Sequence, residues 1–316
     1  MPPVPITTMR IALLPSAPDP DRAATFVEAS HGCQAARVLR FARVCYASKD
    51  MVDSFLEVAV DAARRAGGLL LGRLGSLRQI DYKGSPSNIV TEMDRQAEAL
   101  IVECIGRRFP NHAILAEEGG GQSGSATHRW IVDPLDGTTN YTHGMPFFAV
   151  SIGLEIDGVV ALGVVYDPNR EECFTARRGQ GAFLNGAPMR VSETPTLDES
   201  LLSTGYPYDI RTIRDNNLAE HAAFMVRCRS VREIGSAAIS LALVAAGRLD
   251  AFWELKLGPW DVAAGCLMVE EAGGRATSPD GGPVDLDSPS VVASNGKIHG
   301  EMLATLREVR GQAPRV

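Results

Sequence analysis

The fold of this chain is decided by the stretch Trp130-Ile131-Val132-Asp133-Pro134-Leu135-Asp136-Gly137-Thr138-Thr139-Asn140. Its first three residues are large or β-branched apolar side chains, which is typical of a buried strand. Pro134 favours extended backbone at Asp133, and Gly137 permits a sharp bend or the close approach of a ligand. The last three residues are types that begin helices. The stretch therefore predicts a strand, an acidic turn and a helix start, which together can hold a hard cation and a phosphate.

Two carboxylates on a loop are often no more than a turn with a helix cap, and this stretch alone leaves that reading open. Two other acidic segments bear on the choice. Glu117 and Glu118 follow the apolar residues 113–115, and Asp261 follows Pro259 and Trp260 at the start of an apolar helix. Each acid lies where an apolar element meets a loop, and functional side chains often occupy such positions on a rigid scaffold.

A cluster of Glu117, Asp133, Asp136 and Asp261 would need cations. Two like charges about 4 Å apart repel by roughly 1 kcal/mol in water and about 4 kcal/mol at an effective dielectric constant of 20. Oxygen ligands without His or Cys select hard ions, so Mg²⁺ is favoured over Zn²⁺. Four carboxylates and a phosphate dianion carry about −6 in total, which three divalent cations neutralise and two reduce to about −2. A site with two to three Mg²⁺ ions follows if the four acids converge.

At these motifs the chain resembles the inositol monophosphatase family, part of the Mg-dependent, lithium-sensitive phosphatase superfamily that includes fructose-1,6-bisphosphatases. The resemblance covers about residue 51 to the C-terminus. It is carried by five motifs: Asn88-Ile89-Val90-Thr91-Glu92-Met93-Asp94, Glu117-Glu118, Asp133-Pro134-Leu135-Asp136-Gly137-Thr138-Thr139-Asn140, Trp260-Asp261-Val262-Ala263-Ala264-Gly265 and Glu270-Glu271-Ala272-Gly273-Gly274. It implies a five-layer αβαβα sandwich and a phosphomonoesterase that uses metal-activated water, without a covalent intermediate. It also implies inhibition by Li⁺.

The resemblance also assigns metal ligands. The first Mg²⁺ is expected at Glu117, Asp133 and the carbonyl oxygen of Leu135. The second is expected at Asp133, Asp136 and Asp261, so that Asp133 bridges the two ions, and Glu117 would also help to hold a third. Two metals about 3.5–4 Å apart can activate a water and stabilise the leaving oxygen of an in-line displacement.

The same resemblance assigns the phosphate and the attacking water. The N–H groups of Gly137 and Thr138 are expected to bind the phosphate, while Thr138 and Asp94 orient and deprotonate the water. Without the resemblance, Asp94 reads as an acid on the surface of a helix.

The alcohol part of the substrate is expected at Asp136, Ala237 and Glu254. Lys83 is a weaker site candidate, since a lysine in a Gly/Ser/Pro loop is usually only solvated. Lys256 puts a charge close to the expected pocket and is a candidate for tuning the choice of substrate.

The elements expected along the chain divide it into an extension and two halves of one phosphatase domain. Residues 1–50 are expected to be a disordered or partly helical extension, since residues 1–21 contain six prolines. The half spanning residues 51–195 is predicted to hold two helices and an antiparallel sheet, and the half spanning 196–316 an α/β layer. The predicted helices are 51–74, 91–108, 216–226, 236–246 and 261–271; the predicted strands are 147–154, 159–165, 173–176, 182–184, 201–204, 230–232 and 251–253, with a hairpin or loop at 76–90.

Composition narrows the class of protein. The 316 residues carry a net charge of −7, which does not indicate a surface that binds nucleic acid. No apolar run is long enough to span a membrane. The six cysteines include no Cys-x-x-Cys pair, so free thiols and a cytoplasmic location are expected. The family resemblance adds a homodimer.

Three alternatives bear on function. Phosphatases that phosphorylate an Asp place two acids two residues apart, whereas Asp133 and Asp136 are three apart, so that class is disfavoured. A regulatory partner that retains the phosphatase fold is the non-enzyme alternative. Within the family, inositol 1-phosphate is the expected substrate, giving myo-inositol and phosphate. Histidinol phosphate, fructose 1,6-bisphosphate and 3′-phosphoadenosine 5′-phosphate remain alternatives.

A chain that begins at Met51 is expected to fold and to keep its kcat/KM with Mg²⁺, because no predicted site residue precedes Met51. Phosphate release and circular dichroism of the truncated and full chains check this. A large loss of activity in a truncated protein that is well folded would contradict it.

Overall fold

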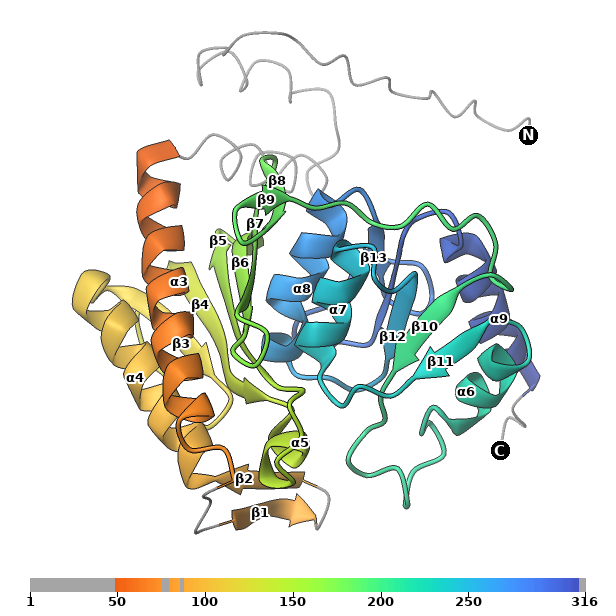
Figure 1. The fold of residues 1–316 in the computed structure, drawn as a ribbon, viewed down its shortest axis with the longest axis horizontal. Helices are drawn as coiled ribbons and strands as arrows, with labels where there is room; N and C mark the ends of the chain where they lie inside the picture. The colour runs from red at the N-terminus through yellow and green to blue at the C-terminus, as the bar shows by residue number, and fades with distance from the viewer. Residues whose placement is uncertain (1–48, 76–79, 86–87, 313–316) are drawn as a thin grey trace, which may run out of the picture.

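The computed structural model describes residues 49–75, 80–85 and 88–312, so the expectations for residues 1–48 lie outside the described part of the chain. Five layers follow one another across the molecule (Figure 1): a helix pair, a seven-stranded sheet, a second helix pair, a five-stranded sheet and two outer helices. The predicted αβαβα sandwich is therefore confirmed. Within the described residues, no helix combines the length and apolarity needed to cross a membrane.

The first helix pair covers one face of the seven-stranded sheet. It consists of α3 (Lys49–Leu71) and α4 (Glu92–Arg108), which are separated by the hairpin of β1 (Ile80–Ser85) and β2 (Asn88–Thr91). Phe55, Ala59, Ala62 and Ala66 lie on one face of α3 and are buried, as the helical spacing predicts. Both predicted helices are thus confirmed.

The seven-stranded sheet is antiparallel except at one edge. Its strands are β3 (His112–Ala116), β4 (Ser125–Asp136), β5 (Ala149–Ile156), β6 (Val159–Asp167), β7 (Glu172–Arg177), β8 (Gly181–Leu184) and β9 (Ala187–Pro188), in that order. β3 pairs with β4 in parallel. This is possible because the chain first doubles back, with Gln122 bonded to Ile114 in both directions, before it enters β4.

The middle helix pair lies between the two sheets (Figure 1). It consists of α7 (Ala237–Ala245) and α8 (Pro259–Glu271), and both helices contact strands on either side. Every residue of α7 except Leu243 is buried, as are residues 262–269 of α8. A helix covered on both faces has to be apolar all round, which explains why these two segments show little amphipathic pattern.

The five-stranded sheet is mixed. β10 (Leu201–Thr204) runs parallel to β11 (Ser230–Arg232) and to β12 (Ala251–Glu254), while β14 (Val291–Ser294) runs antiparallel to β12 and to β13 (Arg275–Thr277). The outer face is covered by α6 (Leu218–Met225) and α9 (His299–Gln312). The predicted alternation of strands and helices is confirmed up to α8. β13, β14 and α9 were not predicted from the sequence pattern.

Helix α8 packs very closely on the seven-stranded sheet because two glycines face it. Gly153 of β5 pairs with Gly163 of β6. Gly153 lies against Ala263 and Ala264 of α8, and Gly163 lies against Ala264. A Cβ atom at position 163 would lie 2.8 Å from the Cα atom of Ala264. The two positions therefore set how near α8 lies to the sheet.

Gly163→Ala is expected to destabilise the fold by about 1–3 kcal/mol, because the added methyl group overpacks the contact between helix and sheet. Gly68→Ala on α3 is the matched control, since a Cβ atom there meets nothing within 4 Å. The control should be neutral or stabilising by about 0.5–1 kcal/mol, because alanine favours a helix over glycine. Urea unfolding of both variants measures the effects. Equal stability of the two would contradict this account.

Candidate active site

Three of the four predicted acids meet where β4 ends and α8 begins. Asp133 lies in β4, Asp136 is its last residue, and Asp261 lies in the first turn of α8. One carboxylate oxygen from each lies within 4.8 Å of the other two. Asp133 and Asp136 are buried, and Asp261 is half-buried. The structure thus brings together two residues of the stretch 130–140 and a third residue that follows more than a hundred residues later.

The fourth acid, Glu117, lies on the turn after β3. Its backbone N–H donates to the carbonyl oxygen of Val132 at 3.2 Å, which ties this turn to β4. Its charge raises the pKa of both Asp133 and Asp261, so it belongs to the same electrostatic cluster.

A buried acid that the sequence did not single out holds this turn in place. Glu98 of α4 accepts hydrogen bonds from the backbone N–H groups of Glu118 and Gly120, each at 2.7 Å. The available signal was its spacing, since Glu98 follows Asp94 by four residues and therefore shares its helix face. Glu98 positions the turn that carries Glu117.

The cluster is electrostatically strained without a cation. Burial raises the pKa of Asp133 well above its usual range, and the charges of Glu117, Asp136 and Asp261 raise it further. Burial likewise raises the pKa of Asp261, and that of Asp136 to about 6. A buried set of carboxylates is stabilised in its ionised form by positive charge, and oxygen ligands suit hard divalent ions. The residues present therefore fit a Mg²⁺ site.

Hydrogen bonds orient each carboxylate. Asp136 Oδ2 accepts from Ser236 Oγ at 2.5 Å and from the Ala238 N–H at 2.7 Å, at the start of α7. Asp261 Oδ2 accepts from the Gly258 N–H at 2.6 Å. Asp133 Oδ1 accepts from the Leu135 N–H at 2.9 Å. These bonds lower the cost of burying the charges and leave little rotational freedom.

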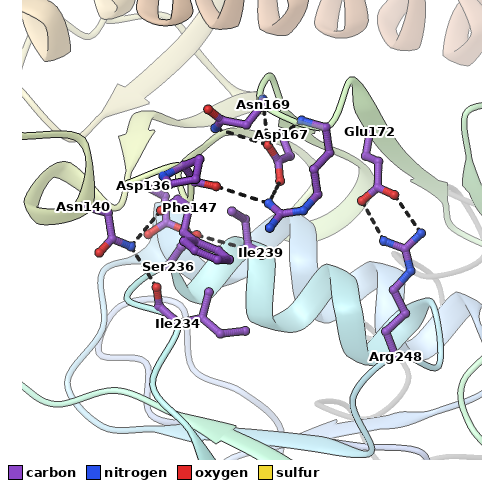
Figure 2. Close-up of polar contacts among 12 residues, drawn as sticks. Asp136, Asn140, Phe147, Asp167, Asn169, Glu172, Ile234, Ser236, Ile239 and Arg248 are labelled. Atoms are coloured by element: carbon purple, nitrogen blue, oxygen red, sulfur yellow. Dashed lines mark hydrogen bonds and ion pairs between the residues drawn. The ribbon is translucent and has the colours of Figure 1, made fainter. Parts of the chain in front are cut away.

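Asn140 connects the stretch 130–140 to the turn before α7. Its side-chain amide donates to the carbonyl oxygens of Phe147 and Ile234, each at 2.8 Å, as Figure 2 shows. Asn140 is buried at the end of the acidic turn, in the short helix α5 (Thr138–Thr142). The sequence marked it only as a residue type that starts helices. Its place in the structure is to hold α5 against the segment that carries Ser236.

Asp94 is buried, so the reading of it as a surface acid is wrong. It lies at the third position of α4, where Oδ2 accepts from the backbone N–H of Thr91 at 2.8 Å and from Thr91 Oγ1 at 2.5 Å. Burial raises its pKa, while the hydrogen bonds from Thr91 and Thr138 lower it. The reciprocal cap with Thr91 draws Asp94 inward from a helix that looks polar at this end.

The pair of Asp94 and Thr138 that the resemblance predicts is present. Thr138 Oγ1 lies 3.0 Å from Asp94 Oδ1 and 3.1 Å from the carbonyl oxygen of Leu135. A hydroxyl has one proton, so it donates to only one of these acceptors at a time. When it donates to Asp94, the Leu135 oxygen is available to another partner.

Three further predicted residues, Gly137, Ala237 and Glu254, belong to elements next to this cluster. Gly137 has a φ of 99°, and a Cβ atom there would lie 2.8 Å from the carbonyl oxygen of Phe147, so the turn requires glycine. Ala237 is buried as the first residue of α7. Glu254 ends β12, and its pKa is raised well above its usual range by burial and by the charges of Asp261, Asp136 and Glu233. The side chain of Lys83 lies outside the described residues.

Comparison with known proteins identifies the family. The family model described as "Inositol monophosphatase family" matches residues 51–311. The chain is 48% identical over 257 residues to the inositol-1-monophosphatase of Synechocystis sp., covering 81% of this chain and 89% of that protein. It is also 43% identical to the Nus factor SuhB of Pseudomonas aeruginosa, covering 80% and 95%. The chain belongs to the inositol monophosphatase family.

Solved structures agree with this membership. The inositol monophosphatase from Anabaena matches with a TM-score of 0.75 and 43% identity, over 81% of this chain and 96% of that one. The Thermotoga maritima inositol monophosphatase matches with a TM-score of 0.75 and 38% identity, over 82% and 99%. The resemblance seen in the motifs is confirmed, and with it the expectation of a phosphatase.

Asp133→Asn and Asp261→Asn are each expected to nearly abolish phosphate release and to weaken Mg²⁺ binding while the fold persists. The loss should exceed the roughly 10- to 100-fold that removal of an outer partner costs a metal site. Phosphate release and calorimetric Mg²⁺ titration measure the two effects.

Asp167→Asn is the matched control, since Asp167 is buried on β6, is paired with Arg170 at 2.7 Å, and is not among the charges that shift the pKa values of Asp133, Asp136 and Asp261. This variant should lose thermal stability and keep its Mg²⁺ affinity. A wild-type rate in either Asp133→Asn or Asp261→Asn would overturn the assignment of the metal ligands.

Proposed function

We propose that this protein is a Mg²⁺-dependent phosphomonoesterase that converts inositol 1-phosphate to myo-inositol and phosphate. The observation that carries the proposal is the convergence of Asp133, Asp136 and Asp261 within 4.8 Å, in a chain of the inositol monophosphatase family. The site residues of this proposal are those that the sequence predicted.

The metal site of the proposal consists of Glu117, Asp133, Asp136, Asp261 and the carbonyl oxygen of Leu135, and it takes two to three Mg²⁺ ions. When bound, Mg²⁺ supplies the positive charge that a phosphate dianion needs near these acids and makes a bound water more acidic. The raised pKa values of Asp133 and Asp261 support a requirement for such charge.

The chain's own groups supply orientation and proton transfer in this proposal. The N–H groups of Gly137 and Thr138 hold the phosphate at the turn after β4. Thr138 accepts a hydrogen bond from the attacking water and passes its own proton toward Asp94, which lies 3.0 Å from the hydroxyl. A carboxylate whose pKa is raised by burial is a better base than one in water. No covalent bond to the protein is required.

The alcohol part of the substrate is proposed to lie against Asp136, Ala237 and Glu254. Asp261, Asp136 and Glu233 make the surroundings of Glu254 negative, which favours hydroxyl groups over a second phosphate. This argues against fructose 1,6-bisphosphate and 3′-phosphoadenosine 5′-phosphate. Lys256 is the nearby cation, but its Nζ lies 3.6 Å from Asp209 Oδ2 and so is already paired.

We propose a cytoplasmic homodimer whose two chain halves, 51–195 and 196–316, form one phosphatase domain. A regulatory role is the second candidate function, because relatives such as the Pseudomonas aeruginosa protein carry the name Nus factor SuhB. The assembled acidic cluster favours the enzyme. Turnover of inositol 1-phosphate, histidinol phosphate, fructose 1,6-bisphosphate and 3′-phosphoadenosine 5′-phosphate with Mg²⁺, compared by kcat/KM, tests the proposal. Absence of phosphate release from all four would favour the regulatory role.

Glu254→Gln is expected to lower kcat/KM for inositol 1-phosphate roughly 10- to 150-fold, because hydrogen bonds to a charged group contribute about 1.5–3 kcal/mol. An aryl phosphate has no hydroxyl for Glu254 to accept from, so its turnover should hardly change. The Mg²⁺ dependence should also stay nearly the same. Kinetics with both substrates over a range of Mg²⁺ concentrations measure this.

Glu233→Gln removes the neighbouring exposed negative charge and is the matched control, expected to leave the ratio between the two substrates nearly unchanged. Equal losses on both substrates in Glu254→Gln, or a collapse of Mg²⁺ affinity, would instead place Glu254 in the metal site or in the support of the fold.

A further inference from the structure

Ser151 carries a buried hydroxyl that has no part in the function described so far. It lies in β5, and in the register of the sheet it stands directly opposite Asp133 of β4. Residues directly opposite in an antiparallel pair share one face of the sheet, with Cβ atoms about 4.5–5.5 Å apart. Gly153, two residues further along β5, shares this face and lies against Ala263 of α8. Ser151 and Asp133 therefore both face α8, at the candidate active site.

The hydroxyl of Ser151 connects the sheet to the first turn of α8. Its Oγ donates to the carbonyl oxygen of Trp260 at 3.0 Å. Trp260 is the second residue of α8 and immediately precedes Asp261, a predicted metal ligand. A buried hydroxyl costs free energy unless it is hydrogen-bonded, and its single proton serves one acceptor at a time. The proton of Ser151 is therefore directed to the helix, which leaves the neighbouring Asp133 carboxylate to other partners.

Hydrogen bonds within the first turn of α8 fix Asp261 relative to the helix. Its Oδ2 accepts from the Gly258 N–H at 2.6 Å, and its own N–H donates to the Gly258 carbonyl oxygen at 3.2 Å. These bonds do not fix α8 relative to β4 and β5. The contacts of Gly153 and Gly163 with α8 set how near the helix lies to the sheet. The bond from Ser151 adds a directional restraint, which the helix would lose if it moved along the sheet.

We propose that Ser151 is a positioning residue for the metal site. Its hydroxyl holds the first turn of α8 against β5 and thereby fixes the separation between the carboxylates of Asp133 and Asp261. The inference rests on the proposed function, which assigns these two carboxylates to the same Mg²⁺ ion. Mg²⁺ requires near-ideal octahedral geometry with oxygens at about 2.0–2.1 Å, so a small displacement of one carboxylate lowers the affinity. Ser151 acts through Asp261 rather than on the ion itself.

Ser151→Ala is expected to raise the Kd for Mg²⁺ about 10-fold, at the lower end of the range for loss of an outer partner of a metal site. Calorimetric titration of the full chain without substrate measures this. The Mg²⁺ concentration for half-maximal turnover of inositol 1-phosphate should rise by a similar factor, while kcat at saturating Mg²⁺ should return close to the wild-type value. The Tm should fall by about 2–4 °C, because one neutral hydrogen bond is lost.

Ser200→Ala is the matched control. Ser200 is equally buried, and its Oγ donates to the carbonyl oxygen of Thr196 at 2.7 Å, in the segment before β10 that holds no predicted site residue. This variant should show a similar fall in Tm and a wild-type Kd for Mg²⁺. A purely structural role of Ser151 would give the same result in Ser151→Ala.

Ser151→Cys separates the hydrogen bond from packing, since a thiol fills the place of the hydroxyl but is only a weak donor. It should also bind Mg²⁺ more weakly than the wild type does. Circular dichroism checks the fold of each variant, and Ser151→Cys carries the test if the alanine variant is unfolded. A wild-type Kd for Mg²⁺ in either folded Ser151 variant would overturn the inference, and so would an equal rise of the Kd in Ser200→Ala.

The same measurements distinguish this inference from the proposed function. If the wild type binds Mg²⁺ and hydrolyses inositol 1-phosphate while the Ser151 variants bind Mg²⁺ equally well, only the inference about Ser151 fails. If the wild type binds Mg²⁺ but releases no phosphate from any of the four candidate substrates, the proposed function fails, and the Kd values of the variants still decide the inference. If the wild type binds no Mg²⁺, the proposed metal site and the inference fail together.

Discussion

The structure around the candidate active site depends on the mutual repulsion of carboxylates that the fold holds together. Burial raises the cost of ionising Asp133, Asp136 and Asp261, which lie close together, and the charge of Asp136 raises this cost further for the other two. The fold has to supply enough packing to offset it. Each carboxylate accepts hydrogen bonds from the backbone or from Ser236, which reduces the cost of burial without neutralising the charge. The negative charge that remains favours the binding of cations at this site.

The middle helix layer brings acids that are distant in the sequence together in one cluster. α8 lies close to β5 and β6 because Gly153 and Gly163 have no side chain at the two positions nearest to Ala263 and Ala264. Its first turn thereby carries Asp261 to the end of β4, where Asp136 is already bonded to the start of α7. The same two helices form the core between the sheets. The position of α8 therefore determines both the packing of the core and the geometry of the site. A change in the spacing between this helix and the sheet would alter both.

Buried polar groups outside the cluster decide how rigid the site is. Glu98 holds the turn of Glu117 through two backbone N–H groups, and Asn140 joins α5 to the segment before α7. Asn217 does the same for the loop of residues 205–217, between β10 and α6. In each case one side chain satisfies backbone groups of a loop that has no regular partner strand. Loops held in this way can present functional groups without first having to become ordered.

The sequence alone determined the strand that ends in Asp133 and Asp136, most helix and strand boundaries through α8, and the family motifs, because these depend on local periodicity and turn chemistry. Contacts between distant residues decided the rest. Asp94 looked exposed because its helix is polar, yet the cap with Thr91 and the bond to Thr138 bury it. The parallel pairing of β3 depends on the chain doubling back at Gln122. The role of Glu98 depends on a turn built from another part of the chain, which no local pattern encodes.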